Sequence, residues 1–138
     1  MISTEDEQDI RTSLRKVLSK FPDEYWMQHD MQHEFAWDFY KAMADAGWLG
    51  ITTPEEFGGG GAGVQEAALL MEEVAGSGGG LNASTMVQVA LFGLEPIVKY
   101  GTQEQKERFL PAAATGNLQV AFGVTEPDAG TDTTSITT

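Results

Sequence analysis

The sequence predicts a mainly α-helical fold of about six helices, followed by a single strand near its C-terminal end. Three observations lead to this prediction. Apolar residues recur at helical spacing through most of the chain, glycine-rich stretches interrupt them at residues 58–63 and 76–80, and a β-prone run occurs only at residues 119–125. At 138 residues, the chain fits one domain with one core.

The helices follow one another with clear signals for where each begins and ends. The first starts near Thr4 and ends at Pro22, and the second carries Phe35, Phe39 and Met43 at intervals of four residues, with Gly47 as its C-terminal cap. A helix that is apolar nearly all round follows the first glycine-rich stretch, which predicts that it is buried. Pro111 is expected to kink or end the last helix. The predicted helices extend over residues 4–21, 23–45, 64–75, 81–92, 95–100 and 102–114.

Composition excludes several classes of function. The net charge of −13 would repel nucleic acid and anionic membranes, so neither is an expected partner. The absence of cysteine excludes disulfides and thiolate chemistry. The N-terminal residues are acidic and do not resemble a leader, and no run of apolar residues is long enough to predict membrane insertion. The cytoplasm is therefore the default location.

Two short motifs suggest ligand binding, but each has a simpler interpretation. Gly58, Gly60 and Gly63 match the spacing of a dinucleotide-binding loop, yet the residues before them are polar rather than a buried strand, which favours a flexible turn. His29 and His33 are four residues apart, as two metal ligands on a helix would be. No third ligand is indicated, so the sequence predicts no metal site.

The stretch VAFGVTEPDAGTD, residues 120–132, is the strongest candidate for a ligand site. A β-prone run ends at Thr125, Pro127 fixes the backbone, and Gly130 permits a positive φ. This pattern predicts a strand followed by a tight loop, whose amide N–H groups and threonine hydroxyls could face an anionic or heterocyclic ligand. An ordinary turn after a strand is the alternative interpretation.

This stretch resembles the signature of the flavin-dependent acyl-CoA dehydrogenases, x-x-T-E-P-x-A-G-S-D. Other segments resemble the same family in the same order: AGWLGITTPEEFGGGG, MEEVAG and YGTQEQKERFLPAAATG. The resemblance implies that residues 1–117 form the family's N-terminal helical domain, and that residues 118–138 begin its middle β-domain.

The resemblance also implies roles for particular residues. Phe122 and Val124 would line the flavin ring of FAD, Thr125 would hydrogen-bond its edge, and Thr131, in place of the family's serine, would reach phosphate or the coenzyme A ligand. The helix at 81–92 would form one wall of the acyl pocket. The residues that we expect to contact the substrate there are Ser84, Thr85, Gln88 and Phe92; helix packing alone is the alternative.

The implied reaction is oxidation of an acyl-CoA thioester to the 2,3-enoyl-CoA, with electrons passing to a separate acceptor protein. The family's glutamate base belongs to a C-terminal four-helix domain that this sequence does not include. We therefore expect no catalytic residue in the 138-residue chain, which by itself should be inactive and should form homo-oligomers. The alternative is a non-catalytic helical module that docks on a partner chain.

Overall fold

The computed structural model describes residues 2–138 and is mainly helical within them, as the sequence predicts. Its α-helices and short 3-10 helices are, in chain order, α1 (Thr4–Leu18), α2 (Asp23–Gln32), α3 (Trp37–Asp45), η1 (Trp48–Gly50), η2 (Glu55–Phe57), α4 (Val64–Ala75), α5 (Gly80–Phe92), α6 (Glu95–Tyr100), α7 (Gln103–Ala114) and η3 (Thr133–Ser135).

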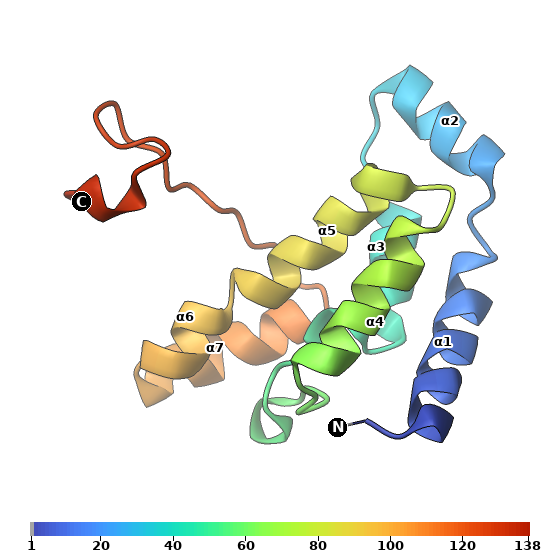
Figure 1. Cartoon of the computed structure of the whole chain (residues 1–138), viewed down its shortest axis with the longest axis horizontal. Coiled ribbons are helices and arrows are strands. Elements are labelled where there is room, and N and C mark those ends of the chain that lie inside the picture. Colours follow the sequence, from blue (N-terminus) through green and yellow to red (C-terminus); the bar gives the residue numbers. More distant parts are fainter. Residues whose placement is uncertain (1) are drawn as a thin grey trace.

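Helices α1, α4 and α5 lie side by side, with α3 packed behind α5 (Figure 1). The main hydrophobic core lies between these helices, and buried side chains from α2 and from the connecting segments, such as Trp26 and Leu49, complete it. Only Leu70 and Val74 of α4 are buried, so this helix is less buried than its apolar pattern predicts. The fully buried core residues include Leu14, Phe39, Met43, Leu70, Val74 and Val87.

The predicted helix over residues 23–45 is two helices. His33 adopts a left-handed conformation at φ 55°, which ends α2. Phe39 and Met43 are fully buried in α3, as their spacing predicts, whereas Phe35 precedes α3 and is 39% exposed. The break thus removes Phe35 from the predicted core stripe. It also means that His33 lies beyond the end of the helix that carries His29, so the two rings do not share one helical turn.

The glycine run folds back onto the chain that precedes it. The amides of Gly60, Gly61 and Ala62 donate to the carbonyls of Gly50, Thr53 and Ile51, at 3.0, 2.9 and 2.9 Å. A Cβ on Gly59 would lie only 2.1 Å from the carbonyl oxygen of Thr53. The glycines therefore permit close backbone packing, and three consecutive amides of the run are committed to internal bonds rather than available to a phosphate.

A second hydrophobic core joins α6 and α7 to η2. It consists of the buried residues Phe57, Leu94, Leu110 and Ala113, with partly buried neighbours that include Leu118 and Val120. Helix α7 passes through Pro111 and continues to Ala114, so it does not end at the proline. Proline removes only the one backbone hydrogen bond that its own N–H would donate, and the helix continues for three residues beyond it.

The stretch Gly80–Tyr100, which spans α5 and α6, is long and apolar enough by length and composition to cross a membrane. This is weak support for a membrane span, since a core helix of a soluble protein meets the same criterion. Here Ala83, Val87 and Ala90 are buried against neighbouring helices. We interpret α5 as a core helix.

The C-terminal segment differs from the predicted strand. Residues 119–125 are extended, but no strand pairs with them in the part of the chain that the structure describes. Beyond them, an isolated bridge joins Glu126 to Ala129. A β-prone run becomes a strand only when another strand supplies its hydrogen bonds. Figure 1 shows the chain extending away from the helices toward the C-terminus after this segment.

Candidate functional site

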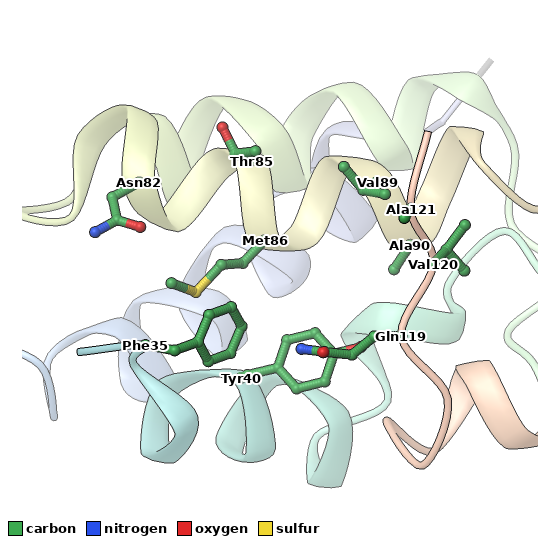
Figure 2. Close-up of a pocket in the computed structure, with 10 residues that line it drawn as sticks. All are labelled: Phe35, Tyr40, Asn82, Thr85, Met86, Val89, Ala90, Gln119, Val120 and Ala121. Carbon is green, nitrogen blue, oxygen red and sulfur yellow. The ribbon is translucent and has the colours of Figure 1, made fainter. Parts of the chain in front are cut away.

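A cavity of about 360 Å³ lies between α5, the start of α3 and the extended segment (Figure 2). Cavities of about 300–1,000 Å³ are typical of small-molecule sites. Three parts of the chain that are distant in sequence meet here, and most of the side chains they contribute are apolar. The lining residues are Phe35, Tyr40, Asn82, Thr85, Met86, Val89, Ala90, Gln119, Val120 and Ala121.

The cavity is suited to an uncharged, apolar group. Met86 points from α5 toward Phe35, and Tyr40 lies beside Gln119 (Figure 2). Burial raises the pKa of Tyr40, so its phenol stays neutral at ordinary pH. None of the ten lining residues is an aspartate, glutamate, histidine, lysine or arginine. These residues can therefore surround an apolar ligand, but they supply no general base.

Helix α5 does not present the four predicted substrate residues on one surface. Ser84 is buried, and its hydroxyl donates to the Gly80 carbonyl at 2.6 Å. Thr85 and Gln88 are exposed, and Phe92 is 38% exposed. Of the four, only Thr85 lines the cavity. Successive helix positions are about 100° apart, which places Ser84 beside the core residues Ala83 and Val87 and turns the other three outward.

Sequence reasoning did not identify Met86 and Val89 as cavity residues. They are spaced with Asn82 and Thr85 at i, i+3, i+4 and i+7, so these four residues share a second face of α5. Met86 has an ordinary explanation as a core side chain when the sequence is considered alone. The helix is apolar nearly all round, and its pattern does not distinguish a face against another helix from a face on a cavity.

The extended segment reaches the end of α5 through an aromatic pair. The rings of Phe92 and Phe122 lie 5.0 Å apart between centroids, at an angle of 80°. This edge-to-face geometry is favourable for aromatic rings. The predicted acyl-pocket residue Phe92 and the predicted flavin residue Phe122 are therefore in direct contact.

The backbone of the extended segment is available to a ligand or to another strand. Within residues 2–138, no backbone amide from Gln119 to Thr125 donates a hydrogen bond. Thr125 is exposed and lies with Val124 on a hollow of about 440 Å³ that Ile136 and Thr138 also line. Unpaired amides beside an exposed hydroxyl fit the polar edge of a flavin ring.

The loop that follows is held by two carboxylates. Glu126 accepts hydrogen bonds from the amides of Thr137 and Thr138 at 3.0 and 2.9 Å. Hydrogen bonds from the Thr138 side chain and from these two amides lower the pKa of Glu126 to about 2. Asp132 caps η3 by accepting from the amide and hydroxyl of Thr134. Both carboxylates thus order the loop around Thr131, which is exposed.

Comparison with known proteins agrees with this architecture. The family described as acyl-CoA dehydrogenase, N-terminal domain, matches residues 4–117. Acyl-CoA dehydrogenase FadE12 of Mycobacterium tuberculosis is 39% identical over 137 residues, which are 99% of this chain and 35% of that protein.

Two solved structures are also similar to this chain. Butyryl-CoA dehydrogenase from Megasphaera elsdenii matches with a TM-score of 0.82 and 26% identity over 96% of this chain and 35% of its own. A chain in a structure described as an electron transferring flavoprotein of Acidaminococcus fermentans matches with a TM-score of 0.84 and 33% identity, over 98% and 35% of the two chains.

In each case the chain spans about a third of the length of the protein that it matches. The family match nevertheless includes every α-helix of the structure, from the start of α1 to the end of α7. This chain belongs to the acyl-CoA dehydrogenase family.

Proposed function

We propose that this chain is the N-terminal part of an FAD-dependent acyl-CoA dehydrogenase that oxidises an acyl-CoA thioester to the 2,3-enoyl-CoA. One observation carries the proposal. An extended segment with unpaired amides lines the apolar cavity with Gln119, Val120 and Ala121, and the same segment carries the exposed Thr125 four residues further along. Bound FAD would supply the hydride acceptor for this reaction.

The extended segment would hold the cofactor. Thr125 would donate its hydroxyl to the edge of the flavin ring, and Phe122 and Val124 would lie against the ring. Thr131 would reach a phosphate or the coenzyme A ligand. Support comes from the exposure of Thr125 and Thr131 and from the ordering of their loop by Glu126 and Asp132. These side chains would position the flavin and enclose it, and none of them would transfer a proton.

Helix α5 would form the wall that borders the acyl chain. Thr85, Gln88 and Phe92 are the residues of its outward side, and Phe92 would limit the depth of the site. Ser84 would contribute through the packing of α5, because its hydroxyl is already bonded to Gly80. The apolar cavity next to Thr85 would extend the space for the substrate.

The remaining parts of the reaction would come from outside this chain. The proton acceptor is proposed to lie in a C-terminal domain, since the cavity contains no titratable base. Residues 1–117 would be the helical domain, and residues 118–138 would open the middle β-domain, where a neighbouring strand would pair with those amides that do not face the flavin. Similarity to a chain from an electron transferring flavoprotein structure supports an electron-transfer protein as the acceptor. A homo-oligomer is the proposed assembly.

The cofactor role is tested by Thr125→Val in the complete protein that carries this chain. The wild type should purify yellow with flavin absorbance, and the valine variant should retain less flavin or be reduced more slowly by acyl-CoA. A lost hydrogen bond to the ring is worth about 1 kcal/mol or more. Thr12→Val, on the exposed surface of α1, is the matched control. A colourless wild type that co-purifies with another polypeptide would instead support a non-catalytic docking module.

The acyl wall is tested by Phe92→Ala, which should shift preference toward longer acyl-CoA substrates. Because Phe92 is 38% exposed, its removal should destabilise the protein by less than the 3–5 kcal/mol or so typical of a fully buried phenylalanine. Tyr100→Ala is the control, since Tyr100 is 85% exposed on α6. If folded Phe92→Ala shows an unchanged preference for acyl chain length, the proposal that α5 borders the acyl chain is refuted.

A further inference from the structure

The extended segment is held against the helices although it belongs to no sheet within the described residues. Leu118 and Val120 pack against the second hydrophobic core. Side chains in an extended chain alternate, so Leu118, Val120 and Phe122 share one side. All three contact the helical domain, in the second core or at Phe92. The segment therefore has a register against α5 and α7 without strand pairing.

Gly93 lies in close contact with the extended segment. It is the C-cap of α5 and has a right-handed conformation, so its φ does not require glycine. A Cβ at this position would lie 2.7 Å from Val120 Cγ1 and 2.6 Å from the Val89 carbonyl oxygen. A side chain here would therefore meet both the last turn of α5 and Val120, which fills part of the space beside Gly93.

The hydrogen bonds within the loop at residues 126–138 do not fix its position relative to α5. The carboxylate of Glu126 bonds to residues 137 and 138, and that of Asp132 bonds to Thr134 and Ser135. These bonds fix the internal shape of residues 126–138. The position of the loop relative to α5 depends on what holds the segment before it.

We propose that Gly93 is a positioning residue: together with the Phe92–Phe122 pair, it sets the register of the segment that carries Thr125. A side chain at Gly93 would push Val120 away by about 1 Å before ordinary van der Waals contact is regained. That displacement would shift the segment that continues to Thr125. The role of Gly93 in placing Thr125 against a flavin depends on the proposed function. Its role in setting the position of the segment against α5 does not.

The experiment is Gly93→Ala in the 138-residue chain, which has no cysteine of its own. Spin labels on cysteines introduced at the exposed positions Leu81 and Asp128 report the distance from α5 to the loop by pulsed electron resonance. Gly76→Ala is the matched control. Gly76 is the right-handed C-cap of α4, and its added Cβ would meet backbone oxygens of its own helix and no other segment.

The expected result is a shifted or broadened distance distribution in Gly93→Ala and an unchanged one in Gly76→Ala. Val120→Ala combined with Gly93→Ala removes the clashing methyl group and should restore much of the original distribution. The double variant also distinguishes two effects of the added Cβ. It removes the contact with Val120 but leaves the contact with the Val89 carbonyl oxygen at the end of α5. A distribution unaffected by Gly93→Ala, or a disturbed one that Val120→Ala does not correct, would refute the proposal.

The two proposals can fail separately because the distance measurement requires no flavin. If the complete protein binds no FAD while Gly93→Ala still displaces the loop, the register is correct and the cofactor assignment is wrong. If FAD binds and Thr125→Val weakens its retention, but Gly93→Ala leaves the loop in place, the cofactor assignment is supported and the role of Gly93 is refuted.

Discussion

The helical part of the chain and residues 119–138 are stabilised in different ways. The helices bury two hydrophobic cores, whereas Ala129 is the only buried residue from 119 to 138. The helical backbone bonds to itself, while the amides of residues 119–125 donate no bond within the described chain. Burial therefore holds the helices, and side-chain caps with a few edge contacts hold the C-terminal segment. The segment with the ligand signature is the one with less internal support, as is common for binding loops.

The largest expected difference between the two regions is in the cost of removing an aromatic ring. Phe39 is fully buried, and its ring lies 5.4 Å from that of Phe21 and 4.9 Å from that of Trp26. Phe39→Ala should lower the free energy of unfolding by about 3–5 kcal/mol. Phe122→Ala should cost far less, because Phe122 is 63% exposed. Chemical denaturation followed by circular dichroism measures both, and equal losses would contradict the comparison.

A smaller effect is expected at the ion pairs that join α1 to α4. Glu73 is 10% exposed and accepts hydrogen bonds from Arg15 at 2.7 Å and Arg11 at 2.8 Å, whereas Glu72 is 67% exposed and contacts Arg11 alone. Glu73→Gln should cost about 1–3 kcal/mol of stability, and Glu72→Gln about 1 kcal/mol or less. Chemical denaturation of the two variants in parallel measures both losses of stability. A larger loss of stability for Glu72→Gln than for Glu73→Gln would show that exposure does not determine how much each ion pair contributes.

The stability that Glu73 contributes through Arg15 and Arg11 depends on pH. Hydrogen bonds from Arg15 and Arg11 hold the pKa of Glu73 below its ordinary value. A lowered pKa in the folded state adds stability above the ordinary value of about 4.5, and this stability is lost as pH falls through the lowered value. The wild type should therefore lose more stability than Glu73→Gln below about pH 4.5, which thermal unfolding at several pH values would measure.

The smallest effect on stability, and the most local, is expected at Glu126. Its pKa of about 2 means that its bonds to the Thr137 and Thr138 amides persist well below pH 4.5 and are lost as pH approaches 2. The amide proton shifts of these two threonines should titrate near pH 2, while those of core helices stay constant there. Glu126→Gln should abolish the titration. A midpoint near 4.5 would show that the carboxylate is not bonded as described.

Local sequence signals predicted much of the helical part. The glycine-rich stretches separate α3 from α4 and α4 from α5, and Gly47 takes the left-handed conformation expected just beyond α3. Thr102 forms its capping box with Gln105 at the start of α7. The first helix begins at Thr4, as predicted, and Ser3 is its N-cap. These features depend on neighbours within one turn of helix, which a sequence displays directly.

The sequence by itself determined the helical class, most helix boundaries and the family signature at 120–132, because each depends on residues close together in the chain. The tertiary structure decided what needs contacts across the chain. Only the structure shows that α2 ends at His33 and that Ser84 is buried. Likewise, only the structure shows that Met86 and Val89 line a cavity and that Phe122 contacts Phe92. It also left residues 119–125 extended but unpaired, since a strand requires a partner that its own sequence cannot specify.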